Sequence, residues 1–471
     1  MRRMSVGEIA GVTGGELVRG DPSIEVSAVS TDTRQLRPGE LFFALTGDRY
    51  DAHVFLTKAF EAGAAGAVVS RLVEMAPAFP VIRVADTLTA LQTLAAYNRS
   101  LYDVPVIGIT GSTGKTTTKD MVASVLGARL RVLKTEGNLN NEIGLPLTLL
   151  AMDGTHQAAV VEMAMRGPGE IDRLCQIARP TGAVITSIGE SHLERLGTIS
   201  NIAKAKGEIL DHIPPEGFAL LNGESPFILR EAGRCRGRVI FFTLVQSFDR
   251  MLTDKDPEFV SRIVAAGIEA GNSGSWFTVR VNGETDTFYL PAPGRHNVQN
   301  ALAAVGVGRE LGLSPAEIAD GLAKVALTGM RLEVVEAGDL KIINDAYNAS
   351  PASDRAALQV LTGYAAGGRK VAVLGDMLEL GPRAKAGHRE VGETAAALGV
   401  DCLVTVGELA REIAAGAVQA GLPEWKVFSC AGNDEVIRVL QKFLKPGDVV
   451  LVKGSRGMKM EQVVRGLGWK G

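Results

Sequence analysis

The chain has 471 residues, which at roughly 100 to 200 residues per domain is enough for about three domains and a large buried core. Apolar residues make up 46% of it and charged residues 22%, the ordinary composition of soluble globular proteins. The net charge of -3 provides no basic field for a polyanion, so nucleic acid is excluded as an expected partner.

Residues 1–100 predict a small α/β domain. Ser5 and Glu8 have the spacing of a capping box, in which each side chain satisfies a free backbone NH group of the other residue. The short helix that follows is expected to end at Gly14 and Gly15. Apolar runs then predict, in order, a strand at 41–45, a helix around 58–62 and a strand at 65–69.

The sequence shows no feature of an exported or membrane-spanning protein. Residues 1–11 lack the apolar run of a signal peptide, and no later stretch reaches the ~18 to 20 apolar residues of a membrane span. The cysteines are scattered and form no C-x-x-C pair, which argues against a zinc knuckle or a disulfide scaffold. We therefore expect a soluble, cytoplasmic protein. The cysteines are Cys175, Cys235, Cys402 and Cys430.

A central α/β domain is predicted over residues 101–327. The apolar strand 103–109 runs into a glycine-rich loop at 110–116 and then into a helical pattern that ends near Leu126. Further apolar runs continue the alternation, which favours a mostly parallel sheet covered by helices. An Asn-Gly turn signal at 282–283 predicts an antiparallel hairpin at the border of this sheet. The other strands are expected at 158–162, 183–188, 218–221, 276–281 and 287–290.

A third domain is predicted over residues 328–471. Strand and helix signals restart there and alternate to the end of the sequence, as in a doubly wound domain. No internal repeat or low-complexity linker interrupts them. The strands are expected at 340–344, 370–375, 402–406, 425–429 and 448–452.

The strongest chemical signal is the glycine-rich loop. Its glycines let backbone NH groups close around a phosphate, Lys115 would place a positive charge on the β and γ oxygens, and Thr116 could hold magnesium. The loop departs from the strict G-x-x-x-x-G-K-[ST] pattern because Ile109 occupies the first glycine position and Gly108 lies one residue early. A chance loop is the alternative. The expected nucleotide-binding residues here are Thr110, Gly111, Ser112, Thr113, Gly114, Lys115, Thr116 and Thr117.

This loop, of the form T-G-[ST]-x-G-K-[ST], resembles that of the Mur ligases and of the related enzymes that make folylpolyglutamate. Residues 137–146 resemble the block that follows the loop in these enzymes, although alone they could be an ordinary polar loop. The resemblance spans nearly the whole chain. It implies an α/β, ATP-dependent amide ligase with a small N-terminal UDP-sugar-binding domain, a central P-loop ATPase-like domain with a parallel sheet, and a C-terminal doubly wound, Rossmann-like domain that binds nucleotide and acceptor.

The resemblance also implies a magnesium site. Glu162 ends a strand, as a metal-holding carboxylate would require, and it would share Mg²⁺ with Thr116, His192 and a carbamylated Lys206. Carbamylation turns a cation that would repel the ion into an anion that can bind it. Without the resemblance, Glu162 would be a surface acid, His192 a loop hydrogen-bonding residue as readily as a ligand, and Lys206 a solvated helix residue. The expected catalytic residues are Lys115, Glu162, His192 and Lys206.

Two further segments are expected to hold ATP. Asn297 and Asn300 lie in a segment that resembles the adenine-side helix of the family, and their amides could satisfy the donor and acceptor edge of the base. The alternative for this pair is an N-cap and a first-turn polar residue. From the third domain, Arg331 would contact phosphate, and Asp345 the ribose or the metal shell. ATP would then lie between the second and third domains, and domain closure on substrate is a hypothesis.

Four segments of the third domain resemble the member of the family that joins D-alanyl-D-alanine to the UDP-N-acetylmuramoyl tripeptide through an acyl phosphate, a step in peptidoglycan precursor synthesis. Taken singly, Asp376 and Glu379 could be a strand-end acid and a helix cap. Lys453 and Arg456 could likewise be a surface pair. The four segments lie at 345–351, 373–381, 388–390 and 452–458.

The expected substrate-binding residues come from both ends of the chain. Thr33 and Arg34 lie in segments that resemble the nucleotide-sugar domain of the family, while Tyr347 and Asn348 belong to the third domain. Without the family, the N-terminal pair are ordinary turn residues. Thr33 stands where many relatives carry serine and keeps the hydroxyl, and Ala164 stands where glycine is frequent, so both are mild departures.

The chemistry implied by the resemblance demands no strong general base, because the attacking α-amino group has a pKa of about 8 and is partly neutral near neutral pH. We expect a monomer. The closest rival is the ligase that adds lysine or diaminopimelate one step earlier. A rival of another class is a P-loop binding or switch protein without ligase activity.

Overall fold

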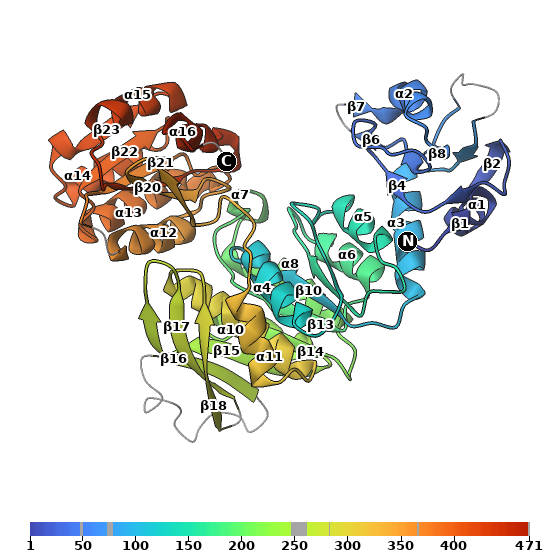
Figure 1. Cartoon of the computed structure of the whole chain (residues 1–471), viewed down its shortest axis with the longest axis horizontal. Helices are drawn as coiled ribbons and strands as arrows, with labels where there is room; N and C mark the ends of the chain where they lie inside the picture. The colour runs from blue at the N-terminus through green and yellow to red at the C-terminus, as the bar shows by residue number, and fades with distance from the viewer. Residues whose placement is uncertain (48–49, 73–78, 246–260, 282, 365–366, 470–471) are drawn as a thin grey trace.

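Three main β-sheets follow one another along the chain, and helices cover each of them (Figure 1). The computed structural model describes residues 1–47, 50–72, 79–245, 261–281, 283–364 and 367–469. We call each sheet with its helices the N-terminal, central and C-terminal part. The N-terminal and C-terminal parts lie on opposite sides of the central part. Among the described residues, none of the helices has the length and apolar character needed to cross a membrane.

The N-terminal part is built on a five-stranded sheet in the order β2-β9-β8-β5-β4, with two small two-stranded sheets beside it. The predicted strands and helix are confirmed as β5, β8 and α2. The capping box is only half formed, since Ser5 accepts from the Glu8 NH group at 3.1 Å while the Glu8 carboxylate pairs with Arg2. Helix α1 ends as expected at Gly14, whose φ of 65° suits glycine. The elements are β1 (Met4–Ser5), α1 (Val6–Thr13), β2 (Glu16–Arg19), β3 (Glu25–Val26), β4 (Val29–Ser30), β5 (Leu41–Phe43), β6 (Thr46–Gly47), β7 (Tyr50–Asp51), η1 (Ala52–Phe55), α2 (Leu56–Glu61), β8 (Gly66–Val69), β9 (Val81–Arg83) and α3 (Thr87–Ser100).

The central part carries a nine-stranded sheet in the order β11-β12-β10-β13-β14-β15-β16-β17-β18. The strands β11 to β16 are parallel, while β16, β17 and β18 are antiparallel, so both predictions for this sheet are confirmed. Gly283, with φ 87°, is the turn residue just before the return strand, and Asn282 lies outside the described residues. The elements are β10 (Val106–Thr110), α4 (Lys115–Gly127), β11 (Val132–Lys134), α5 (Gly144–Leu150), β12 (Ala158–Glu162), α6 (Glu170–Ala178), β13 (Gly182–Ile185), α7 (Leu193–Leu196), α8 (Ile199–Gly207), η2 (Glu208–His212), β14 (Phe218–Asn222), α9 (Pro226–Glu231), η3 (Ala232–Arg234), β15 (Arg238–Leu244), β16 (Ser261–Ala270), β17 (Ser275–Val281), β18 (Glu284–Leu290), α10 (Arg295–Glu310) and α11 (Pro315–Ala323).

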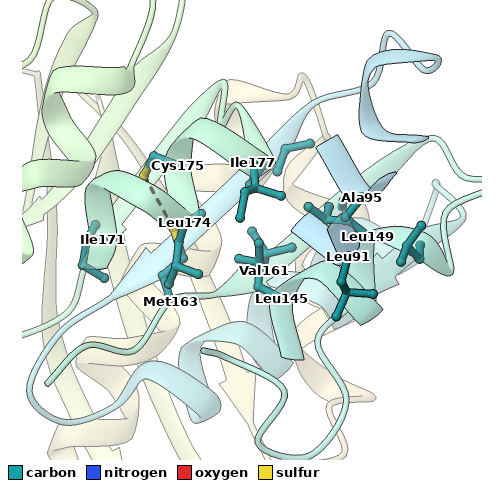
Figure 2. Packing of buried hydrophobic residues seen from close by; sticks show 14 of the residues in the cluster. Leu91, Ala95, Leu145, Leu149, Val161, Met163, Ile171, Leu174, Cys175 and Ile177 are labelled. Carbon is teal, nitrogen blue, oxygen red and sulfur yellow. Dashed lines mark hydrogen bonds between the residues drawn. The ribbon is translucent and has the colours of Figure 1, made fainter. Parts of the chain in front are cut away.

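Successive residues of the central strands enter two different cores, as strands buried on both faces require. In β10, Ile107 and Ile109 pack with α4, α10 and α11 on one face, whereas Val106 packs with α5, α6 and α8 on the other. The core that contains Val106 continues through α3 into the N-terminal part. Figure 2 shows Leu91 of α3 facing Leu145 and Leu149 of α5.

The C-terminal part has a six-stranded sheet in the order β19-β20-β24-β21-β22-β23, in which the edge strand β19 pairs antiparallel with β20 and the other neighbouring strands are parallel. The predicted doubly wound fold is confirmed. The strand expected at 425–429 begins instead at Val427, because a 3-10 turn occupies the preceding residues. The elements are β19 (Glu333–Ala337), β20 (Leu340–Asp345), α12 (Pro351–Gly363), β21 (Lys370–Gly375), η5 (Gly381–Arg383), α13 (Ala384–Ala397), β22 (Cys402–Val406), α14 (Arg411–Gln419), η6 (Glu424–Lys426), β23 (Val427–Cys430), α15 (Asn433–Phe443), β24 (Val449–Lys453), η7 (Arg456–Met458) and α16 (Glu461–Gly466).

Residues 324–332 link the central and C-terminal parts. Thr328 fastens this linker to helix α4, since its NH and hydroxyl groups donate to Oδ2 of the buried Asp120 at 2.9 and 2.7 Å. Met330 and Leu332 have φ angles of 60° and 53°, which non-glycine residues rarely adopt. The linker therefore presents Arg331 between two strained neighbours.

Candidate active site

A cavity of about 440 Å³ lies between the central and C-terminal parts. Its walls come from the carboxyl ends of β10, β12 and β13 on one side and of β20 and β24 on the other. The carboxyl edge of a parallel sheet is where α/β proteins bind ligands. The predicted site residues that line this cavity are Ser112, Thr113, Gly114, Lys115, Thr116, Thr117, Glu162, Asn297, Asn300, Arg331, Asp345, Tyr347 and Asn348.

The glycine-rich loop is locked in place by the chain that follows β13. Thr186 donates its hydroxyl to the Thr113 carbonyl at 2.6 Å, and the Thr113 NH group donates to Ser187 Oγ at 2.9 Å. At Gly111, with φ 151°, an added Cβ would lie 2.0 Å from Thr186 Oγ1, so only glycine fits. Thr186 and Ser187 were not among the predicted site residues, because the apolar pattern placed both inside a strand at 183–188, which ends instead at Ile185. Helix α4 then begins at Lys115, directing its first NH groups toward the loop.

Two cations converge on the cavity. Lys115 donates to the Gly111 carbonyl at 2.9 Å, and its pKa is lowered by burial and by the charge of Arg331. The guanidinium of Arg331 stacks over the Tyr347 ring, 4.0 Å from its centre, and among the described residues its buried Nε has no hydrogen-bond partner. Because like charges repel, an anion between the two side chains would stabilise both. The arrangement suits a phosphate group.

Glu162 lies in the same wall. Its Oε2 accepts from the Thr116 hydroxyl and its Oε1 from the Asn140 amide, both at 2.8 Å. Only 2% of the residue is exposed, so the interpretation as a surface acid is wrong. Asn140, which was not named as a site residue, belongs to the block predicted after the loop. The hydroxyl and the carboxylate that were expected to share magnesium thus lie together.

Lys206 is fully buried in α8, and no described residue provides a hydrogen-bond partner for its Nζ. The interpretation as a solvated helix residue is therefore wrong for Lys206, although the neighbouring Lys204 is exposed. Burial lowers the pKa of Lys206 well below its usual value, and the charge of Lys115 lowers it further. A buried amine without partners is a costly arrangement. A carboxyl group added to this nitrogen would remove the cation and create a metal ligand.

His192 stands just outside the cavity wall, next to the lining residue Ser191. Its Nδ1 lies 3.1 Å from Glu379 Oε2 of the C-terminal part. Burial lowers the pKa of His192 to about 4, with Lys206 and Lys115 adding to the effect, so the imidazole is neutral at neutral pH, as a metal ligand must be. Within the described residues no three His, Cys, Asp or Glu side chains gather as a metal site. The predicted set therefore depends on the Thr116 hydroxyl and on a modified Lys206.

Lys453 is a site residue that the sequence analysis missed. It is buried, and its Nζ donates to Asp345 Oδ2 at 2.6 Å and to the Asn348 carbonyl at 2.8 Å. The alternative that it belongs to a surface pair is wrong, whereas Arg456 does pair near the surface with Glu461. Asp345 accepts from the Leu332 NH group with its other oxygen. It therefore already holds both Lys453 and the linker.

The two asparagines expected near adenine lie on the first turns of α10. Gly294 caps this helix, so the interpretation of either asparagine as the N-cap is wrong. Asn297 donates to the Pro293 carbonyl at 2.7 Å. Asn300 approaches the loop so closely that a Cβ at Gly114 would lie 2.6 Å from its Oδ1. Helix α10 thus lies against the glycine-rich loop at Gly114.

The expected substrate residues fall in two places. Tyr347 and Asn348 line the cavity, while Thr33 and Arg34 lie in the N-terminal part and do not. Arg34 is exposed and pairs with Asp32 at 2.7 Å. The structure therefore leaves the N-terminal pair apart from the other predicted residues.

Comparisons with known proteins match the whole chain. The Mur ligase middle domain matches residues 109–308, and the Mur ligase, glutamate ligase domain matches residues 330–456. The UDP-N-acetylmuramoyl-tripeptide--D-alanyl-D-alanine ligase of Bacillus subtilis is 42% identical over 96% of both chains, and that of Escherichia coli is 36% identical over 99% of both.

Solved structures agree. MurF from Acinetobacter baumannii superposes with a TM-score of 0.87 at 32% identity, covering 99% of both chains. MurF ligase from Thermotoga maritima in complex with ADP has a TM-score of 0.79 at 28% identity over 93% of this chain and 96% of that one. The resemblance seen in the sequence is confirmed, and the chain belongs to the Mur ligase family.

Proposed function

We propose that the chain is an ATP-dependent ligase that joins D-alanyl-D-alanine to the UDP-N-acetylmuramoyl tripeptide in peptidoglycan precursor synthesis, forming ADP and phosphate. The observation that carries this proposal is full-length similarity, at 36 to 42% identity, to relatives that bear this name. The cavity supports it, because cations from both the central and the C-terminal part converge there. The enzyme would act in the cytoplasm as a monomer.

The reaction requires activation of a carboxylate, which by itself is a poor electrophile. The terminal carboxylate oxygen of the tripeptide attacks the γ-phosphorus of ATP, the bond to the β-phosphate oxygen breaks, and ADP leaves. The amine of D-alanyl-D-alanine then attacks the acyl carbon, phosphate leaves with the C–O electron pair, and the nitrogen loses its proton. Lys115 and Arg331 would neutralise charge on the transferred group, and the locked glycine-rich loop would orient it.

Magnesium would be held by Thr116, Glu162, His192 and a carbamylated Lys206. When bound, Mg²⁺ supplies positive charge to the phosphate oxygens. The orphaned Nζ of Lys206 is the observation that favours this set, because carbamylation would end its unpaired burial. Thr116 and Glu162 already lie within hydrogen-bonding distance of each other, so their oxygens could hold the ion together.

ATP would occupy the cavity with its phosphates on residues 110–117. Asn297 and Asn300 would bind adenine, and Arg331 the phosphates. Asp345, held by Lys453 and the linker, would contact the ribose or the metal shell. Thr33 and Arg34 would bind the UDP-sugar, and Tyr347 and Asn348 the acceptor or peptide. We propose the corresponding domains as 1–100 for the UDP-sugar, 101–327 for ATP and ligation, and 328–471 for nucleotide and acceptor.

The test is phosphate release from ATP with UDP-N-acetylmuramoyl tripeptide, measured with and without D-alanyl-D-alanine. Release that needs both substrates supports the proposal. Release that needs UDP-N-acetylmuramoyl dipeptide and a free diamino acid would assign the chain to the preceding step, and release that ignores all acceptors would favour a switch protein. Lys115→Met should abolish release, while Lys442→Met, at an exposed lysine of α15, serves as the matched control.

A further inference from the structure

A second contact joins the central and C-terminal parts outside the cavity. The chain around α7 reaches toward the C-terminal part (Figure 1) and meets η5. Arg383 lies 3.1 Å from Glu190, and Gly381 packs so closely that a Cβ there would lie 3.0 Å from the Glu194 Cα. His192 and Glu379 form the part of this contact nearest the cavity, with Nδ1 and Oε2 3.1 Å apart.

Both members of this pair have an uncommon backbone. His192 has φ 68° and Glu379 has φ 65°, a left-handed conformation that costs a non-glycine residue roughly 1 to 2 kcal/mol. Six described non-glycine residues have a positive φ. Four of them lie where the central and C-terminal parts meet, namely His192, Glu379, Met330 and Leu332. Strained residues collect where function requires a fixed geometry.

The two ring nitrogens of His192 can have different roles in this contact. A histidine that binds a metal through one ring nitrogen usually has its other nitrogen held by a carboxylate, which fixes the direction of the ring. Here Nδ1 faces Glu379, which leaves Nε2 as the ligand atom. His192 follows Ser191, which lines the cavity together with Thr116 and Glu162, so the imidazole stands beside the proposed metal set.

The carboxylate does not serve the core. Glu379 is 67% exposed, so the fold does not need it for packing. It follows a strand of the C-terminal part, whereas every proposed metal ligand belongs to the central part. Its contact with His192 therefore exists only while the two parts are docked.

We propose that Glu379 is a positioning residue for the metal site, which holds Nδ1 of His192 so that Nε2 is aimed at the ion only when the C-terminal part is docked against the α7 segment. This inference rests on the proposed function. Docking of the C-terminal part and metal binding are then coupled. By thermodynamic linkage, each increases the equilibrium constant of the other by the same factor. The site would hold its ion most tightly in the arrangement that also places Arg331 at the phosphates.

The test measures Mn²⁺ binding to the full-length protein in the presence of ADP, by calorimetry or by the electron paramagnetic resonance signal of free Mn²⁺. Glu379→Ala should weaken Mn²⁺ about 10-fold or more, as loss of a carboxylate behind a ligand histidine does. Glu379→Gln should restore part of this affinity, because its amide oxygen can still accept from Nδ1. Glu408→Ala, at an exposed glutamate of the same part, is the matched control and should bind as the wild type does.

A double-mutant cycle separates positioning from a general structural role. If Glu379 acts through His192, the double variant His192→Ala/Glu379→Ala should bind Mn²⁺ as weakly as His192→Ala alone. Equal binding by Glu379→Ala and Glu408→Ala, with weaker binding by His192→Ala, overturns the proposal and leaves the ligase function standing. Unchanged binding by His192→Ala overturns both this proposal and the ligand set, whereas substrate-dependent phosphate release is scored separately and decides the ligase function.

Discussion

The central part meets its two neighbours through junctions of opposite character. Helix α3 joins it to the N-terminal part through a continuous apolar core in which Leu91 faces Leu149 (Figure 2). At the same contact, the Asn98 amide donates to the Leu149 carbonyl at 2.9 Å. The C-terminal part touches it through a linker, a cavity and ion pairs such as Arg383 with Glu190.

The difference indicates which junction can move. Burying a large apolar side chain contributes roughly 1.5 to 3 kcal/mol, and separating such a core would cost that contribution for every residue. Exposed ion pairs contribute about 0 to 1 kcal/mol each and exchange readily with water. The N-terminal and central parts should therefore behave as one body, while the C-terminal part can open to admit ATP and release ADP.

The largest expected effect is loss of stability at the apolar junction. Leu91→Ala should lower the free energy of unfolding by about 2 to 5 kcal/mol, since a fully buried leucine leaves a cavity. Urea unfolding followed by fluorescence measures this. Leu378→Ala makes the same change next to Glu379 in the C-terminal part, where the side chain is 44% exposed, and should cost less than about 1 kcal/mol. Equal losses in the two variants would contradict the contrast between the junctions.

The next effect concerns turnover rather than stability. Arg331→Met should reduce kcat by about 100-fold or more, because one charge that faces the transferred phosphoryl group is lost. Stability should change little, since no described residue accepts a hydrogen bond from its Nε. Arg456→Met, at a half-exposed arginine, is the control. Wild-type turnover of Arg331→Met in the phosphate-release assay would place ATP elsewhere.

A smaller effect is expected where the linker is fastened. Thr328→Val removes the hydroxyl that donates to Asp120 at 2.7 Å, and a hydrogen bond to a charged group contributes about 1.5 to 3 kcal/mol. The variant should lose about that much stability in urea unfolding, together with a few-fold increase in KM for ATP. Thr155→Val, at an exposed threonine that also donates to an aspartate, provides a matched control. An unchanged KM would mean that the linker does not govern docking.

The sequence predicted well what depends on neighbouring residues. The strand, glycine-rich loop and helix at 106–127 are encoded by a contiguous pattern, and the turn at Gly283 by a dipeptide. The pattern also predicted that Glu162 ends a strand, and its role at the site was implied by the family resemblance; in the structure this strand pairs with β10, which brings the carboxylate beside the loop.

What it could not predict depends on residues far apart in the chain. Lys453 is buried because β24 inserts between β20 and β21, an order that no local pattern reveals. The pairing of His192 with Glu379 depends on how two parts dock. Even the local capping box is incomplete. Ser5 accepts from the Glu8 NH group as predicted, but the Glu8 carboxylate pairs with Arg2.

A further effect appears only when the pH is varied, and it comes from a carboxyl group buried on the C-terminal side of the cavity. Burial raises the pKa of Asp354 from 3.8 to about 7, although Lys453, 3.8 Å away, acts against the shift. Between pH 4 and 7 the folded protein keeps a proton on this carboxyl that the unfolded chain releases. The stability that this proton contributes is therefore complete below about pH 4 and is lost as the pH rises through about 7.

Asp354→Asn removes that titration while keeping the shape of the side chain. The difference in unfolding free energy, wild type minus variant, should fall as the pH rises from 4 to 7, by at most about 1.4 kcal/mol per pH unit, and should be level above that range. Urea unfolding at half-unit steps of pH measures it. Leu91→Ala should instead differ from the wild type by a constant amount at every pH, because a leucine side chain does not titrate. Parallel curves for Asp354→Asn would show that Lys453 keeps the carboxyl ionised, and that this side of the cavity holds an ion pair rather than a neutral acid.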